Sequence, residues 1–163
     1  MLKIITMHRI VVTDSTPIIS LLRIGQLEIL KDTYQEIIIP YAVLDEVTIK
    51  DTRFWKKHDW IHAIAIKNLA AKEMFSSALH AGEVEVMLLS KEIGADLVIM
   101  DDSLARRHAK YLGLTVTGTI GVLLRAKSIG VIKNIAPVLN KLIQNGFYIS
   151  DNVFREIMRL ADE

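Results

Sequence analysis

The chain has 163 residues, no cysteine and a net charge of +1, with a mean hydropathy of +0.31. This length suits a single domain, and the lack of cysteine excludes disulfides and thiolate metal sites. No run of about 18 apolar residues predicts a membrane span and no signal peptide is recognised, so we expect a cytoplasmic protein. Few Asn and Gln residues together with no Cys favour a thermophilic source.

The first half of the chain alternates short apolar runs with helical patterns. Residues 10–13 predict a strand, and the helix after it is expected to be capped by Ser15 or Thr16 and ended by Gly25. The pattern then predicts, in order, a helix over 26–32, a strand over 36–39, a helix over 41–49 and an edge strand over 61–66.

The second half continues the alternation. It predicts helices over 68–79, 81–94, 103–113, 119–130, about 135–144 and about 152–161, and strands over 95–102 and 114–118. Gly94 is expected to end the second of these helices. Strands that alternate with helices indicate an α/β fold built in layers around a mostly parallel sheet. We expect residues 1–163 to form a single domain, with a core over about 10–130 and a C-terminal helical extension over about 131–163.

Acidic residues follow two of these strands directly. Asp14 ends the first strand, and Asp101 and Asp102 end the strand LVIMDD. Glu46 lies about a turn and a half into the helix after Pro40, and Glu83 lies near the start of the helix before LVIMDD, with Glu85 close by. Active sites of such folds lie at the carboxyl ends of the strands, so we expect these acids to converge there.

Converging carboxylates need a counter-charge. Two of them about 5 Å apart repel each other by roughly 3 kcal/mol at an effective dielectric constant of about 20. A group of three or four either takes up protons or binds a cation, and oxygen ligands without thiolates favour Mg²⁺ or Mn²⁺. The reaction that this site suggests is metal-dependent attack of water on a phosphodiester.

Each acid also has a simpler interpretation. Asp14 can cap the helix that follows it, and Glu46 and Glu83 can be acids in first turns that the helix dipole favours. An N-cap role explains one member of the Asp101 and Asp102 pair and leaves the other without a structural reason.

Several motifs resemble the PIN-domain family. These are VVTDSTPIISL, PYAVLDEV, HAGEVEVMLLSKEIGADLVIMDD and SLARRHAKYLGLTVTGTIGVLLRAK, which together cover most of the chain. More narrowly, they are similar to a prokaryotic branch related to VapC-type ribonuclease toxins. The resemblance implies a three-layer α/β/α sandwich that uses Mg²⁺ or Mn²⁺ to hydrolyse RNA.

The resemblance also implies a site. The family's four acids fall on Asp14, Glu46, Glu83 and the pair Asp101 and Asp102, of which the sequence does not choose one. Thr16 stands where the superfamily commonly has Asn, and the hydroxyls of Ser15 and Thr16 are expected to hold water or phosphate.

Arg106 and Arg107 follow the aspartates on a predicted helix. They suit RNA phosphates, although a plain ion pair between Asp102 and Arg106 fits the spacing equally well.

The segment RFWKKHDWIH, residues 53–62, mixes aromatic and basic residues. This composition is typical of single-stranded nucleic-acid binding, but a basic turn with its aromatic rings anchored in the core or on a second subunit is the preferred interpretation.

Two apolar helical segments, LAAKEMF and VEVMLL, indicate a further partner surface. They favour a homodimer or an antitoxin as protein partner, and a crowded core would leave the same pattern. The leading hypothesis is a metal-dependent endoribonuclease, and the alternative is a PIN-like module that binds nucleic acid or a partner with little catalysis.

Overall fold

The fold is built on one sheet of parallel strands. The structure is a computed structural model that describes residues 9–75 and 77–163. In these ranges five strands pair in the order β3-β2-β1-β4-β5, and every pairing is parallel. The strands are β1 (Val11–Thr13), β2 (Ile37–Pro40), β3 (Ile61–Ile64), β4 (Leu97–Ile99) and β5 (Val116–Thr117).

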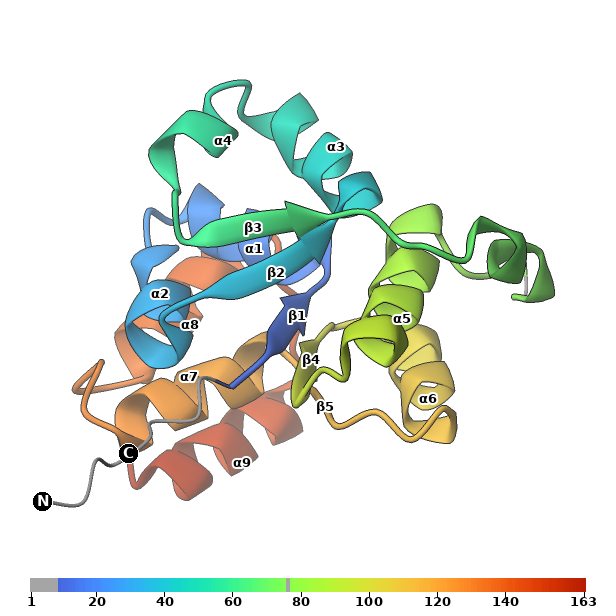
Figure 1. The fold of residues 1–163 in the computed structure, drawn as a ribbon. Coiled ribbons are helices and arrows are strands. Elements are labelled where there is room, and N and C mark those ends of the chain that lie inside the picture. Colours follow the sequence, from blue (N-terminus) through green and yellow to red (C-terminus); the bar gives the residue numbers. More distant parts are fainter. Residues whose placement is uncertain (1–8, 76) are drawn as a thin grey trace, which may run out of the picture.

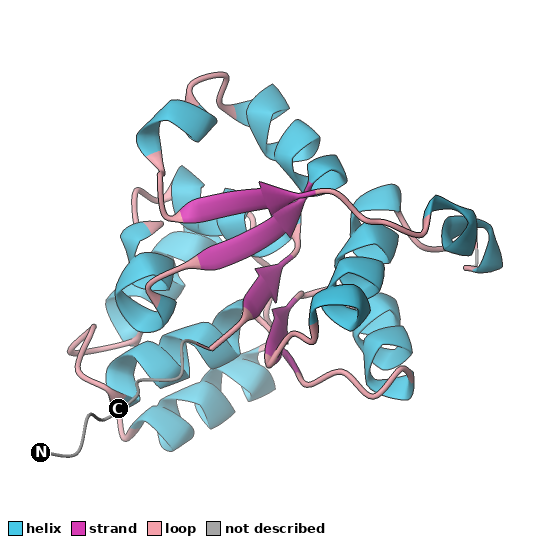
Figure 2. Ribbon diagram, viewed as in Figure 1, coloured by secondary structure: helices cyan, strands magenta, loops and turns pink. Residues whose placement is uncertain are grey.

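Helices cover both faces of this sheet. They are α1 (Ser15–Arg23), α2 (Glu28–Tyr34), α3 (Tyr41–Lys50), α4 (Phe54–Lys57), the 3-10 helix η1 (Leu69–Met74), α5 (Ala81–Ile93), α6 (Ser103–Tyr111), α7 (Thr119–Ser128), α8 (Ala136–Gln144) and α9 (Asp151–Ala161). Figures 1 and 2 show α5 and α6 on one side of the strands and α1, α2 and α7 on the other. The predicted α/β sandwich around a parallel sheet is confirmed.

The strands are buried because the helices leave them little contact with water. All three residues of both β1 and β4 are buried, as expected for parallel strands covered on both faces. Their registers align Thr13 with Ile99, so both strands end at the same level. The residues that follow them, Asp14 and Met100, therefore come out at one edge of the sheet.

The C-terminal helices share the core of the sheet. Leu139 and Leu142 of α8 and Ile157 of α9 are 0–3% exposed and belong to the same hydrophobic cluster as the strands. The C-terminal helices therefore pack on the same hydrophobic core as the strands.

The side chain of Glu163, which follows α9, forms hydrogen bonds to the start of α8. The side chain of Glu163 accepts hydrogen bonds from the backbone N–H groups of Ile135 (2.6 Å) and Ala136 (3.0 Å) and from Lys127 Nζ (2.8 Å). Burial acts to raise the pKa of the Glu163 carboxyl, but these hydrogen bonds outweigh it and lower the pKa to about 2. An acid at the N-terminus of α8 also suits the helix dipole.

Most predicted elements are confirmed, but the helix predicted over 68–79 is wrong. Residues 69–74 form the 3-10 helix η1, and residues 77–79 are turn and bend; residue 76 lies outside the described part of the chain. The side chain of Asn68 accepts a hydrogen bond from the backbone N–H of Ala71 (3.2 Å), which caps a short tight turn. Helical spacing of apolar residues was therefore misleading here.

Of the two predictions for the cap of α1, the one that names Ser15 or Thr16 is wrong and the one that names Asp14 is confirmed. Asp14, and neither Ser15 nor Thr16, is the N-cap residue, and its Oδ1 accepts from the backbone N–H of Ser15 at 2.8 Å. The end of this helix is as predicted: Gly25 follows it with a φ of 68°, a left-handed conformation that glycine adopts without strain.

The segment over 53–62 is anchored by its aromatic rings. Phe54 is fully buried and Trp60 is 6% exposed, so neither ring is available for a base. The side chain of residue 55 lies outside what the structure describes. The preferred interpretation of a basic turn held to the core is confirmed for Phe54 and Trp60.

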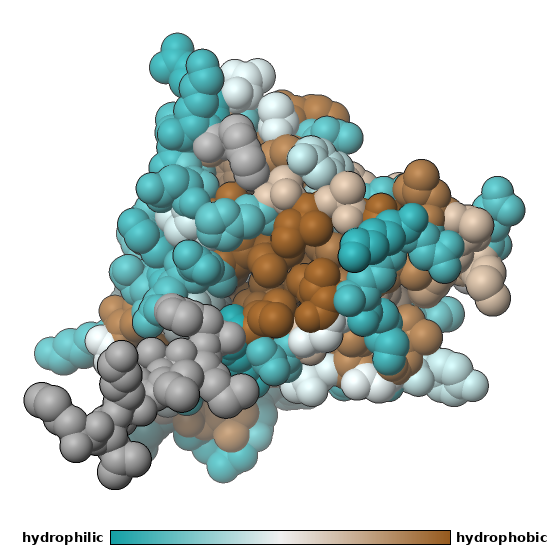
Figure 3. All heavy atoms as spheres, in the orientation of Figure 1, coloured by the Kyte–Doolittle hydropathy of each residue, from teal (hydrophilic) through white to brown (hydrophobic). Residues whose placement is uncertain are grey.

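The two apolar segments behave differently. Val84, Val86, Met87 and Leu89 of α5 are buried in the core, whereas Met74 of η1 is 86% exposed. In Figure 3, hydrophobic side chains gather at the centre of the visible face beside α5, and hydrophilic ones cover α2 and α4 on its left. In the described ranges, no helix is long and apolar enough to cross a membrane.

Candidate functional site

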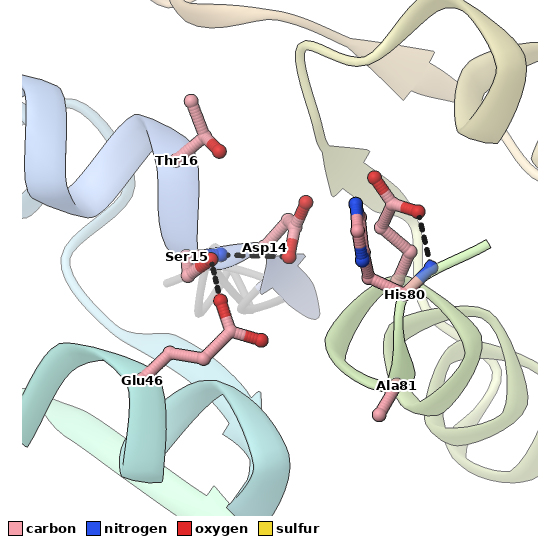
Figure 4. Close-up of a pocket in the computed structure, with 7 residues that line it drawn as sticks. Asp14, Ser15, Thr16, Glu46, His80 and Ala81 are labelled. Carbon is pink, nitrogen blue, oxygen red and sulfur yellow. Dashed lines mark hydrogen bonds between the residues drawn. The ribbon is translucent and has the colours of Figure 1, made fainter. Parts of the chain in front are cut away.

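A polar pocket of about 370 Å³ lies at the carboxyl edge of the sheet. Its walls come from the N-terminal turn of α1, from the middle of α3 and from the start of α5. It is lined by Asp14, Ser15, Thr16, Glu46, His80, Ala81 and Glu83. Figure 4 shows Asp14 between Ser15 and Glu46 on one side and His80 on the other, with Thr16 turned away from it.

Asp14 lies at the centre of this arrangement because β1 delivers it there. Its backbone N–H continues the strand pairing by donating to the carbonyl of Ile99 at 2.8 Å. The residue is 4% exposed. The carboxylate of Asp14 therefore both caps α1 and lines the pocket.

Glu46 approaches from α3. Its Oε2 accepts a hydrogen bond from Ser15 Oγ at 2.5 Å. A Cβ atom built on Gly82 would lie 2.5 Å from Glu46 Oε1 and 3.6 Å from Asp14 Oδ1. The absence of a side chain at Gly82 therefore leaves the space in which these two carboxylates approach α5.

Glu83 and Glu85 have different surroundings although both are buried. The Glu83 side chain accepts from the backbone N–H of His80 at 2.9 Å, as part of the capping box of α5. Glu85 forms an ion pair with Lys72 and accepts from the N–H of Ala42 at 3.1 Å. Glu83 thus lines the pocket, whereas Glu85 holds the start of α3.

The neighbouring residues Asp101 and Asp102 have different hydrogen-bond partners. Asp102 is exposed and is the N-cap of α6, with its Oδ1 accepting from the N–H of Ala105 at 2.9 Å. Asp101 accepts from the backbone N–H of Thr119 (2.7 Å) and from its Oγ1 (2.6 Å). The negative charge of Asp101 is also close enough to raise the pKa of Asp14, although Asp101 is not among the residues that line the pocket.

Arg106 lies beside Asp101, whereas Arg107 lies in another cleft. A Cβ atom built on Gly118 would lie 2.6 Å from an Nη of Arg106 and 2.8 Å from Asp101 Oδ1. Arg106 therefore borders the Asp101 end of the site. Arg107 is exposed and lines a separate cleft on α6 with Tyr111.

The electrostatics of the pocket centre on Asp14. Burial is the largest cause that raises its pKa, and the backbone hydrogen bond from Ser15 acts in the opposite direction. The negative charges of Glu83, Glu46 and Asp101 raise it further, to about 7. Carboxylates from three other segments of the chain thus act on Asp14, and a cation beside it would offset this repulsion.

The donor set suits a hard divalent cation, but the side chains are not arranged around one. Within the described residues, no three His, Cys, Asp or Glu side chains form a group that could hold a metal ion. Each acid accepts a hydrogen bond from a nearby residue instead. Ser15 donates to both Asp14 and Glu46. The backbone N–H of His80 donates to Glu83, and that of Thr119 donates to Asp101. Joint coordination would require side-chain rotations.

Sequence reasoning missed three residues of this site. His80 lines the pocket and begins α5, Gly82 makes room for Glu46, and Thr119 orients Asp101. His80 and Gly82 belong to the segment HAGE, whose position before a predicted helix was a usable signal. Thr119 directly follows the predicted strand over 114–118, which was also a usable signal, but only the pairing of β4 with β5 shows that it meets Asp101.

Comparisons with known proteins agree with this architecture. Residues 10–163 match a family model described as PIN domain. A search of curated proteins finds no match. PIN domains are generally metal-dependent nucleases. Since the matched region spans the sheet, the acid pocket and the C-terminal helices, the chain belongs to the PIN-domain family.

Proposed function

We propose that this protein is an endoribonuclease that depends on Mg²⁺ or Mn²⁺ and hydrolyses RNA phosphodiester bonds. The observation that carries the proposal is that Asp14, Glu46 and Glu83 line one pocket, with Asp101 close enough for its charge to act on Asp14. Burial and, after it, these neighbouring negative charges raise the pKa of Asp14 to about 7. Repulsion between carboxylates destabilises a fold, whereas a metal-dependent nuclease needs several carboxylates close together to bind its cation.

The acids have separate roles in this proposal. Asp14, Glu83 and Asp101 would hold the cation, and Glu46 would complete the site by orienting the attacking water or by binding a second ion. When bound, the cation would make water more acidic and stabilise negative charge on the phosphoryl oxygens. Asp102 would serve chiefly as the cap of α6.

The other polar residues would position the substrate. Ser15 orients Glu46 through its hydroxyl, and the exposed Thr16 can donate to a phosphate oxygen at the mouth of the pocket. Arg106 at the Asp101 end and Arg107 further along α6 would contact RNA phosphates on that side.

A cleavage assay tests this function. Structured and unstructured RNAs are incubated with Mg²⁺, with Mn²⁺ or with EDTA, and wild-type protein is compared with the Asp14→Asn variant. We expect cleavage by the wild type with either metal and none with EDTA. Full activity of the variant at an unchanged thermal stability would exclude the assignment of Asp14.

A second function is favoured by one observation. Because the acids are engaged with local partners and no group of them encloses a cation, a module that binds nucleic acid or a protein without catalysis fits the same arrangement. Isothermal titration with Mn²⁺ separates the two: the nuclease binds the ion through Asp14, and the binding module gives no heat that depends on this residue.

A toxin role, with an antitoxin or a second copy of the chain as partner, extends the leading proposal. It is supported by the exposed apolar residues Leu69, Met74 and Tyr111, which are 65%, 86% and 91% exposed. The lack of cysteine is consistent with a cytoplasmic location. Analytical ultracentrifugation of the pure protein checks the homodimer directly.

A further inference from the structure

A second cleft adjoins the acid pocket and shares Thr16 with it. This cleft has a volume of about 280 Å³ and lies between α1 and the loop that joins α8 to α9. On α1 it is lined by Thr16, Ser20 and Arg23, which are spaced four and three residues apart and so lie on one face of the helix. The acid pocket therefore continues along α1 toward Arg23.

The length of this path suits a short stretch of nucleic acid. At a rise of about 1.5 Å per residue, Arg23 lies roughly 10 Å along the helix axis from Thr16. This distance equals about three nucleotides of a stacked strand at about 3.4 Å each. A strand whose phosphate lies at the mouth of the acid pocket can thus bring a phosphate about three nucleotides further along to Arg23.

The loop opposite α1 presents an aromatic ring to the cleft. Gly146 reverses the chain after α8 with a φ of 93°, a conformation that a residue with a side chain rarely adopts. Phe147 packs against the core and fixes the loop, whereas the next residue, Tyr148, lines the cleft and is 88% exposed. An exposed ring on an anchored loop is suited to stacking.

The charge of the cleft contrasts with that of the acid pocket. Arg23 provides a positive charge, and none of the eight described residues that line the cleft is acidic. Hydroxyl groups of Thr16 and Ser20 and the side chain of Asn145 add hydrogen-bonding groups. A nucleotide would therefore meet a cation, polar groups and an aromatic face, which are the parts of a site for single-stranded nucleic acid.

We propose that this cleft is a subsite for a nucleotide flanking the scissile phosphate of single-stranded RNA. Tyr148 stacks on the base, and Arg23 binds a phosphate of the same strand. This inference rests on the proposed ribonuclease function for the identity of the substrate, and its test uses RNA binding as well as cleavage so that the two can fail separately.

The test measures binding of a fluorescein-labelled oligoadenylate by anisotropy, in an Asp14→Asn background that blocks cleavage. Tyr148→Ala should weaken binding by about 5- to 150-fold, the range found when a stacking aromatic ring is removed. Tyr148→Phe should bind like the parent, because stacking needs the ring and not the hydroxyl group. Tyr41→Ala is the matched control, since Tyr41 is 50% exposed and is not among the residues that line the acid pocket or this cleft.

A second variant tests the phosphate contact. Arg23→Gln should reduce the slope of log affinity against log salt concentration by about 0.7, the loss of one contact to a single strand. This measurement also holds if Tyr148→Ala fails to fold, which a thermal melt reveals. Unchanged binding by a folded Tyr148→Ala variant, an unchanged salt slope for Arg23→Gln, or no RNA binding at all would each overturn the subsite.

Cleavage by otherwise wild-type protein separates this inference from the proposed function. Binding that depends on Tyr148 without any Mn²⁺-dependent cleavage would overturn the nuclease and support an RNA-binding cleft. Cleavage that Tyr148→Ala leaves unchanged, with unchanged oligoadenylate binding, would support the nuclease and overturn the subsite.

Discussion

Two carboxylates of this protein, Asp14 and Glu163, have opposite environments. Asp14 is buried among other acids, and its pKa is raised to about 7. Glu163 meets Lys127 and two backbone N–H groups at the start of α8, and its pKa is lowered to about 2. The first arrangement opposes the charged form and the second favours it. Glu163 thus stabilises the fold, whereas Asp14 reduces stability at neutral pH, as expected of a residue kept for chemistry.

The strongest test of this contrast is the activity of Asp14→Asn. The substitution keeps an acceptor for the Ser15 N–H but removes a charge that would hold the cation. We expect RNA cleavage to fall by about 100-fold or more, because a bound metal contributes several kcal/mol to the reaction. Initial rates on unstructured RNA with Mn²⁺ measure this, and Glu163→Gln is the control whose rate should stay near that of the wild type.

The Asp14→Asn variant should also be more stable than the wild type at high pH. A raised pKa means that proton binding stabilises the folded state at low pH and that this contribution is lost as the pH rises through about 7. Asn does not titrate, so in EDTA the advantage of Asp14→Asn should be larger at pH 8 than at pH 5, by about 2 kcal/mol. Urea unfolding at both pH values measures the difference, and an equal advantage at both would contradict it.

Glu163→Gln should change the pH dependence of folding stability in the opposite direction. A lowered pKa contributes stability above the ordinary value of 4.5 that is lost as the pH falls toward about 2. We expect the substitution to lower the free energy of unfolding at pH 7 by about 1 kcal/mol, after allowance for solvent screening. The loss should shrink as the pH falls toward about 2, where the wild-type carboxylate is also being protonated, and melts between pH 7 and pH 2.5 measure this trend.

The smallest effect is expected for Asp102→Asn. This variant tests whether Asp102 only stabilises the fold, as Glu163 does, or belongs to the proposed site, as Asp14 does. Asn caps a helix as well as Asp, so stability should change by less than about 0.5 kcal/mol and cleavage should be retained. Asp101→Asn should lower cleavage clearly. Loss of activity in Asp102→Asn with an unchanged melt would reverse the proposed roles of the two aspartates.

Much of the fold was predictable because local patterns and global packing agree. Short apolar runs such as LVIM at 97–100 suit strands that are buried on both faces, and Gly25 and Gly94 end their helices as expected. The prediction failed over 68–79, where the Asn68 side chain favours a tight turn over a regular helix. A single side-chain hydrogen bond of this kind is hard to weigh against apolar spacing.

The sequence by itself determined the α/β class, the strand ends and the set of acids that follow them. Strand and helix patterns are local, so neighbouring residues are enough to reveal them. Only the tertiary structure separated Asp101 from Asp102, Glu83 from Glu85, and the exposed Tyr148 from the buried Trp60. These distinctions depend on which segments meet in space, and contacts between residues far apart in the chain leave no periodic signal in it.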